Sequence, residues 1–333
     1  MKRLLCGLVV ALVALSAFAA GGRQAASTDE RIVLKYGHQN AMDNLVHIYS
    51  EKWAQNVLEK SGGRIVIEVY PASQLGNLRE MMEAVELGTL DITLGDTSML
   101  STVLPEFGLL ALPFIFRDYD HAEVVIDGEV GETLNRRLAA ERNMRPLGWF
   151  WNGFRNFATK TPITRVADAR GIKMRSPEAR IYMDTFSMLG MSPTPIPWGD
   201  VYTALASGVV DAAESGPEHI YKQDFYRHAP YVTNSRHIFS VVGPMINEDI
   251  WQSLSAADQR LLMDSLEDIV REQRLAAIEE EGEYYRLLTE AGATITEFEN
   301  PQEVIDLFTP YWGSYAANAN SEDLLQQIMA KAN

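Results

Sequence analysis

The segment from Gly171 to Gly216 constrains the fold of this 333-residue chain more than any other. It reads as strand, helix, proline-rich loop, helix and strand, with the two strands expected at 172–174 and 209–213. Strands that alternate with helices predict an α/β fold whose parallel or mixed sheet is covered by helices. Open sheets of this kind bind ligands at the carboxyl ends of their strands, where Arg175 stands. A guanidinium there can hold a planar carboxylate through two parallel hydrogen bonds.

The N-terminal part repeats this alternation of strand and helix. Arg31–Gly37 and Arg64–Tyr70 alternate apolar and polar residues as half-buried strands do. Between them, Val46–Glu59 carries apolar residues at helical spacing, and a second helix over Leu78–Leu87 leads to a short buried strand, Leu90–Leu94. The order β-α-β-α-β is again that of an α/β sheet.

Two further strands predict a hinge between two lobes. Pro146–Thr159 and His237–Ile246 read as strands that cross and return without a Gly/Ser-rich linker. A helical pattern begins at Ser255, with Asp258 as its capping-box partner, and runs to about Ala291. It would measure roughly 50 Å, enough to span both lobes. The predicted lobes are discontinuous, and their approximate boundaries are 29–152 with 241–275 for lobe I and 153–240 with 276–333 for lobe II.

Residues 1–20 have the three-part pattern of a secretory signal peptide, which predicts a periplasmic protein. Lys2 and Arg3 precede an apolar run that is short for a membrane anchor, and no second apolar stretch of spanning length follows. We therefore expect a mature chain that does not itself span the membrane. Cys6 is the only cysteine and lies within the signal, so disulfides and cysteine-ligated metals are excluded from the mature chain.

The net charge excludes one class of partner. The whole chain carries −16, and removal of Lys2 and Arg3 with the signal makes this −18. Nucleic acid is not expected as a partner, because no basic stripe is available to displace counterions. Binding of an anion would have to depend on a few local arginines.

Three ordered motifs resemble those of the solute-binding component of tripartite ATP-independent periplasmic (TRAP) transporters. They are Gly171–Glu178, Pro193–Leu205 and Val210–Glu214, which follow the family forms G-(L/I)-K-(I/M/L)-R-x-P-x, P-T-P-x-x-(W/F)-x-(D/E)-V-Y-x-A-L and V-D-x-x-E. The similarity extends from near Val33 to about Trp251. It implies two α/β lobes of the periplasmic-binding-protein fold that close on a small carboxylate, without cofactor, metal or catalysis. It also implies small and large membrane permease subunits as partners; we expect the chain itself to be a monomer.

The resemblance assigns three principal ligand contacts. Arg175 would clamp the carboxylate, Arg155 would be a second basic contact, and Trp198 would line the pocket. The residues alone leave other interpretations open: Arg175 on the surface beside Glu178 or Asp211, Arg155 as a structural hinge residue, and Trp198 in the core. Two guanidiniums aimed at one cavity would repel each other and favour an open cleft until an anion arrives.

Further contacts are predicted at polar positions. Asp96 stands where sialic-acid-binding relatives have a glutamate and would accept hydrogen bonds from hydroxyls, although capping of a helix explains it almost as well. Gln39 matches a polar contact after the first strand, and Asn152 offers both a donor and an acceptor.

Ser215 departs from the family pattern. Many relatives carry V-D-G-x-E-N-P, in which the asparagine reaches the ligand, whereas this chain has Ser215-Gly216-Pro217. A serine is shorter, so either water fills the gap or Glu218 and His219 replace the asparagine.

An exported hydrolase is the alternative from another class. The sequence has no G-x-S-x-G, no H-E-x-x-H and no glycine-rich phosphate loop, and its six histidines are scattered, so we predict no enzyme. A periplasmic sensor that presents its bound form to a receptor would use the same clamp and remains an alternative.

Hydroxyl-binding groups around a single clamp favour a sugar acid, such as a uronate or an aldonate, as the ligand. A C4-dicarboxylate or another organic acid is the alternative ligand.

Overall fold

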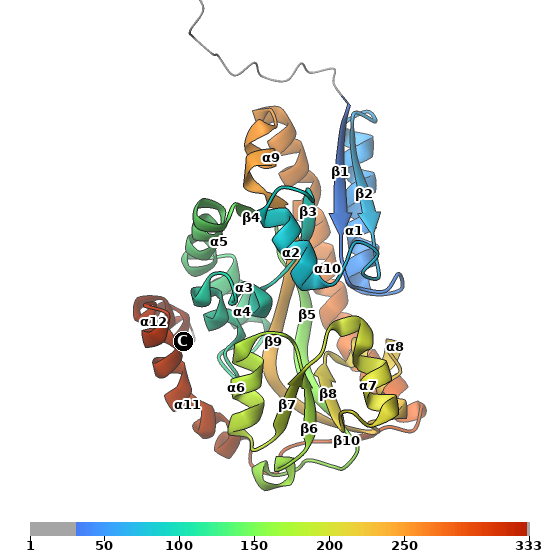
Figure 1. Cartoon of the computed structure of the whole chain (residues 1–333), viewed down its shortest axis with the longest axis vertical. Helices are drawn as coiled ribbons and strands as arrows, with labels where there is room; N and C mark the ends of the chain where they lie inside the picture. The colour runs from blue at the N-terminus through green and yellow to red at the C-terminus, as the bar shows by residue number, and fades with distance from the viewer. Residues whose placement is uncertain (1–30, 332–333) are drawn as a thin grey trace, which may run out of the picture.

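A mixed sheet runs through the length of the molecule (Figure 1). The computed structural model describes residues 31–331, so the predicted signal peptide and Cys6 lie outside the described residues. In order across the sheet the strands are β2 (Ile65–Tyr70), β1 (Ile32–Gly37), β3 (Ile92–Asp96), β9 (Tyr231–Asn247), β5 (Phe150–Thr159), β8 (Ala212–Ser215), β6 (Lys173–Ser176) and β7 (Ser192–Pro195). Short strands β4 (Met144–Pro146) and β10 (Thr294–Thr296) also pair with β9.

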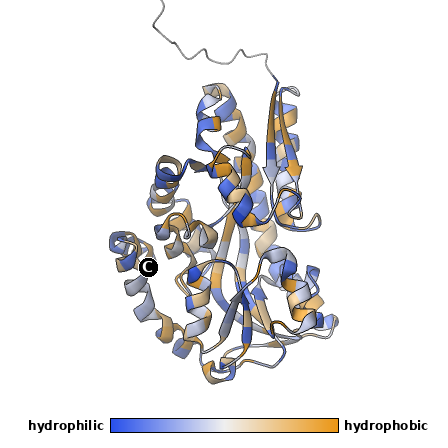
Figure 2. Ribbon diagram, viewed as in Figure 1, coloured by the Kyte–Doolittle hydropathy of each residue, from blue (hydrophilic) through white to orange (hydrophobic). Residues whose placement is uncertain are grey.

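The helices cover this sheet and carry hydrophobic and hydrophilic residues side by side (Figure 2). They are α1 (Leu45–Lys60), α2 (Leu78–Glu86), α3 (Thr97–Leu100), α4 (Tyr119–Ile126), α5 (Glu129–Arg142), α6 (Arg180–Met188), α7 (Val201–Ser207), α8 (Pro217–Lys222), α9 (Glu248–Ser253), α10 (Ala256–Glu290), α11 (Pro301–Asn318) and α12 (Glu322–Ala330). Four short 3₁₀ helices are η1 (Pro105–Ala111), η2 (Val166–Ala169), η3 (Trp198–Asp200) and η4 (Phe225–Arg227).

The two ends of the sheet form two lobes (Figure 1). One end contains β1, β2 and β3, which pair in parallel, and the other contains β6, β7 and β8, which also pair in parallel. Between them β5 and β9 run antiparallel, with register shifts at Trp151/Gly153 and Arg155/Phe157. Such bulges bend a strand locally. The prediction of a mixed α/β sheet crossed by two strands is therefore confirmed, while the exact lobe boundaries stay a prediction.

The predicted long helix is α10, which packs against α1 in one lobe and α8 in the other. Its N-terminus is capped as expected, because the Ser255 side chain accepts a hydrogen bond from the Asp258 N–H. At its middle, buried Gln273 accepts from the Trp151 N–H and donates to the Trp151 carbonyl, both at 2.8 Å. These bonds satisfy backbone groups next to a bulge in β5 and fix the helix to the hinge strand.

Replacement of Gln273 by methionine is expected to destabilise the fold by about 2–5 kcal/mol. The volume is nearly kept, but two buried backbone groups of Trp151 lose their partner, and each costs about 1–3 kcal/mol. Urea unfolding followed by circular dichroism measures the loss. Gln302→Met, on an exposed face of α11, is the matched control and should change stability by less than about 0.5 kcal/mol. Equal stability of the two variants would contradict the role given to Gln273.

Two local predictions were wrong. The proline-rich segment predicted as a loop contains β7, which pairs in parallel with β6. Proline is accepted there because β7 is the edge strand, so a missing N–H on its outer side breaks no ladder bond. The strand expected at 209–213 is shifted to Ala212–Ser215, so Glu214 and Ser215 lie inside β8.

Candidate functional site

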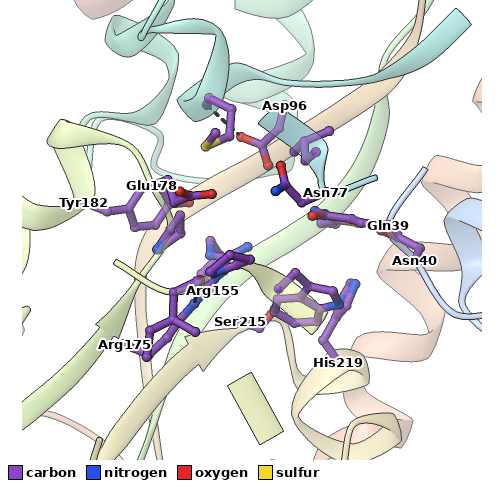
Figure 3. A pocket seen from close by; sticks show the side chains of 17 residues that line it. Gln39, Asn40, Asn77, Asp96, Arg155, Arg175, Glu178, Tyr182, Ser215 and His219 are labelled. Atoms are coloured by element: carbon purple, nitrogen blue, oxygen red, sulfur yellow. Dashed lines mark hydrogen bonds between the residues drawn. The ribbon is translucent and has the colours of Figure 1, made fainter. Parts of the chain in front are cut away.

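A hollow of about 600 Å³, its open mouth included, lies where strands from both lobes end. Seven of the eight predicted contact residues line it: Gln39, Asp96, Asn152, Arg155, Arg175, Trp198 and Ser215. His219, which the sequence analysis offered with Glu218 as a replacement for the asparagine of relatives, also lines it. The sequence analysis did not place in this cavity Asn40, Asn77, Leu78, Met99, Pro177, Glu178, Tyr182, Ile196 and Pro197. Figure 3 shows the two arginines on one side and Asp96 and Asn77 on the other.

Arg175 reaches the cavity from β6, and its side chain is only 4% exposed. Its Nε donates to the Ile196 carbonyl at 3.0 Å, and within residues 31–331 its two Nη groups have no hydrogen-bond partner. Burial lowers the pKa of Arg175 to about 10, against the opposing effect of Glu214, so it remains charged at neutral pH. The alternative of a surface arginine is wrong, because Arg175 is buried and Asp211 pairs with Lys160 instead.

Arg155 lies in the middle of β5 and is bound by Glu214 from β8. Its Nε and Nη2 donate to the two carboxylate oxygens of Glu214, and Nη2 also donates to the Glu214 carbonyl at 3.0 Å. Burial alone would lower the pKa of Arg155, but the carboxylate raises it overall. For Glu214, burial would raise the pKa, and Arg155 brings it down to about 2. Glu214 is therefore ionised and compensates one of the two guanidiniums.

This carboxylate changes the expected electrostatics of the empty cavity. Glu214 Oε1 lies 3.9 Å from Arg175 Nη1, and Oε2 lies 3.6 Å from His237 Nε2. The repulsion predicted between the two arginines is thus largely offset. The V-D-x-x-E motif, which ends at Glu214, was the sequence signal for this carboxylate. Its partner Arg155 lies 59 positions away in the sequence, so the motif did not indicate the pairing.

The opposite wall of the cavity carries the carboxylate of Asp96 and amide side chains, among them Asn77 (Figure 3). Asp96 caps α3, since its Oδ1 accepts from Ser98 N at 2.9 Å and Met99 N at 3.3 Å. Within the described part of the chain its Oδ2 accepts no hydrogen bond, so capping and cavity lining are both roles of this residue. Glu178 also lines the cavity, but it follows β6 in the same lobe as Arg175 and lies beside Tyr182 (Figure 3). The wall opposite Arg175 therefore offers the acceptor oxygens of Asp96 and of the amides.

Aromatic side chains also line the cavity. Trp198, in η3, is partly buried and stands edge-on to His219, with ring centroids 5.4 Å apart. The Arg175 guanidinium lies 5.6 Å from the Trp198 ring centroid and the Arg155 guanidinium 5.4 Å from that of Tyr182. Burial raises the pKa of Tyr182, which stays a neutral hydroxyl. Tyr182 had no signal in the sequence beyond its place on an amphipathic helix.

Glu218, the eighth predicted contact, does not line this cavity. Its Oε1 accepts from the Leu45 N–H at 3.1 Å and from Lys222 Nζ at 2.9 Å. Leu45 begins α1 and Glu218 belongs to α8, so the carboxylate connects the two lobes.

Among residues 31–331 no cluster of three or more His, Cys, Asp or Glu side chains could hold a metal ion. No helix in that range is both long and apolar enough to cross a membrane.

Comparisons with known proteins agree in family and fold. The profile of the family described as bacterial extracellular solute-binding protein, family 7, matches residues 36–318. A solute-binding protein of Roseobacter denitrificans is 32% identical over 86% of this chain and 87% of its own.

Two solved structures of solute-binding proteins are similar to this chain over almost their whole length. The sugar acid binding protein of Advenella mimigardefordensis, in complex with galactonate, is 25% identical with a TM-score of 0.87, covering 91% of this chain and 98% of that one. A TRAP periplasmic solute-binding protein of Roseobacter denitrificans with bound β-D-glucuronate is 25% identical with a TM-score of 0.86, covering 90% and 99%.

Proposed function

Because this chain belongs to the bacterial extracellular solute-binding proteins of family 7, the non-enzymatic receptors of TRAP transporters, we propose that it binds a sugar acid in the periplasm and delivers it to a TRAP permease. The observation that carries the choice of ligand is the buried guanidinium of Arg175, which lines the cavity and whose Nη groups have no hydrogen-bond partner in residues 31–331. The far wall of the cavity presents the acceptors of Asp96 and of the amides. The predicted signal peptide supports the periplasmic location.

Arg175 supplies the carboxylate site. Two charge-assisted hydrogen bonds contribute about 1.5–3 kcal/mol each, a large part of the roughly 8 kcal/mol of a micromolar complex. Arg155 is already hydrogen-bonded to both carboxylate oxygens of Glu214, whereas among residues 31–331 Arg175 has only the longer 3.9 Å contact with that carboxylate. This charge balance favours a ligand with one carboxylate.

The residues on the wall opposite Arg175 favour a ligand whose carbon chain or ring carries hydroxyl groups. Hydroxyls donate to Asp96, which otherwise would be costly to desolvate, while Asn77 and Gln39 both donate and accept. A second carboxylate at that end would face the like charge of Asp96 and be disfavoured. The wall therefore supports a sugar acid over a C4-dicarboxylate. Bound galactonate and glucuronate in the two similar structures support the same choice.

Closure of the lobes links binding to transport in this proposal. The ligand contacts Arg175 in one lobe and Asp96 in the other, so it stabilises the closed arrangement over the open one. The small and large permease subunits then recognise the closed form. Trp198 covers the apolar face of the sugar and excludes water from the clamp.

A thermal-shift screen tests the ligand. We expect D-glucuronate, D-galacturonate or D-galactonate to raise Tm, because a ligand present at 100 times its Kd stabilises the fold by about 2.7 kcal/mol. D-Glucose, which lacks the carboxylate, is the matched control and should leave Tm unchanged. A larger shift with succinate or malate would replace the sugar acid by a dicarboxylate. A response to glucose alone would contradict the clamp.

A further inference from the structure

His219 lines the cavity and has a buried ring nitrogen without a hydrogen-bond partner in the described part of the chain. The residue belongs to α8, is 6% exposed and lines the cavity beside Ser215 (Figure 3). Its Nε2 lies 3.2 Å from Asn44 Nδ2, while its Nδ1 is buried and has no hydrogen-bond partner among residues 31–331. Buried polar atoms nearly always have a hydrogen-bond partner, because leaving one without a partner costs its full desolvation energy. A partner from outside the protein is therefore expected at this atom.

Asn44 determines which ring nitrogen of His219 carries the proton. Its Oδ1 accepts from the Val46 N–H at 3.0 Å, as the N-cap of α1, and from Asn40 Nδ2 at 2.6 Å. Since a backbone N–H can only donate, the capping atom of Asn44 is the oxygen, and the atom that faces His219 is the NH₂ group. That group donates, so His219 Nε2 must accept. A neutral imidazole that accepts at Nε2 carries its proton at Nδ1.

The surroundings keep the ring neutral. Burial is the main effect that lowers the pKa of His219; Glu218 opposes it, and the charges of Arg155 and Lys222 add to the lowering. A protonated ring would also place an Nε2–H against the Asn44 NH₂ group. Nδ1, the nitrogen without a partner, is therefore an N–H donor on a residue that lines the cavity.

We infer that His219, as the Nδ1–H tautomer, donates a hydrogen bond to the bound sugar acid and helps to determine its specificity. The inference rests on the proposed function, and it names the donor that stands in for the asparagine that relatives carry at the position of Ser215. An N–H donor selects an oxygen acceptor, whether hydroxyl, ring oxygen or carboxylate. It disfavours a ligand that places an amine or a methyl group there.

Two substitutions separate this role from the contact with Asn44. The Gln amide reaches the Nε2 position, so His219→Gln keeps an acceptor for Asn44 and loses the donor at Nδ1. The Asn amide ends near the Nδ1 position, so His219→Asn keeps a donor toward the cavity and loses the Asn44 contact. His228→Gln, on a histidine that packs against Tyr202 and does not line the cavity, is the matched control.

Isothermal titration with D-glucuronate and D-galactonate is the measurement. We expect His219→Gln to weaken binding about tenfold, and His219→Asn and His228→Gln to stay within about threefold of the wild type. Retained affinity in His219→Gln would overturn the inference, because a trapped water would then satisfy the nitrogen. Loss in His219→Asn alone would overturn it too, since only the contact between the lobes would matter.

Equal loss in both variants is decided by a spectrum of the wild type. In protein labelled with ¹⁵N-histidine, the long-range ¹H–¹⁵N pattern of His219 identifies the protonated nitrogen, with the signal assigned by its absence in His219→Gln. A proton on Nδ1 whose resonance moves when D-glucuronate or D-galactonate is added supports the inference, and a proton on Nε2 overturns it. Failure of the wild type to bind any sugar acid is a different result, because it contradicts the proposed function before His219 is tested.

Discussion

Replacement of Arg175 by alanine is expected to weaken sugar-acid binding by a factor of at least about 100. The substitution removes two charge-assisted hydrogen bonds to the ligand carboxylate, each of about 1.5–3 kcal/mol, and every 1.4 kcal/mol corresponds to a tenfold change in Kd. Glu214 keeps its two hydrogen bonds to Arg155, so the cavity retains its other charged pair. Isothermal titration with the sugar acid that gives the largest thermal shift measures the effect.

Two further variants decide whether geometry or charge is responsible. Arg175→Lys retains a positive charge without the planar fork, so we expect an intermediate loss of about tenfold. Arg180→Ala removes a guanidinium from the same lobe whose side chain is 90% exposed, and it should leave affinity unchanged. An Arg175→Ala protein that is folded and binds as tightly as Arg180→Ala would contradict the clamp.

Local patterns in the sequence were sufficient for the first strands and for the start of the long helix. The alternation in Arg31–Gly37 and Arg64–Tyr70 predicted β1 and β2, because each strand has one face on the core. Ser255 and Asp258 predicted the start of α10, because capping involves neighbours in the chain. Such interactions are readable without knowledge of the fold.

Interactions between distant segments were not readable in the same way. The pairing of Arg155 with Glu214 depends on β5 lying beside β8, and nothing in the sequence near Arg155 indicates its partner. Glu218 was placed in the cavity by its nearness to Ser215, whereas α8 directs its carboxylate to the first turn of α1. Edge position likewise decided that a proline-rich segment forms β7. The ends of the predicted strands and the family resemblance therefore located the cavity, and the packing of strands and helices decided which side chains face it.

Glu214→Gln is expected to destabilise the fold by about 3–5 kcal/mol. The variant leaves the buried guanidinium of Arg155 without its carboxylate and close to a second buried guanidinium, and removal of one partner from a buried ion pair has this magnitude. Urea unfolding at neutral pH measures the loss. Glu83→Gln is the matched control, because Glu83 pairs with Arg79 on an exposed helix face, and it should cost less than about 0.5 kcal/mol.

The pH dependence identifies the charge of Glu214 as the cause. Its pKa is about 2 in the folded protein, below the ordinary value of 4.5, so its ionisation stabilises the fold above pH 4.5. A shift of this size corresponds to about 3 kcal/mol, which is lost progressively as the pH falls from 4.5 towards 2. The difference in stability between wild type and Glu214→Gln should therefore be constant from pH 7 to about pH 5 and shrink below that. A difference that stays constant down to pH 3 would show that the shape of the side chain, and not its charge, holds Arg155 in place.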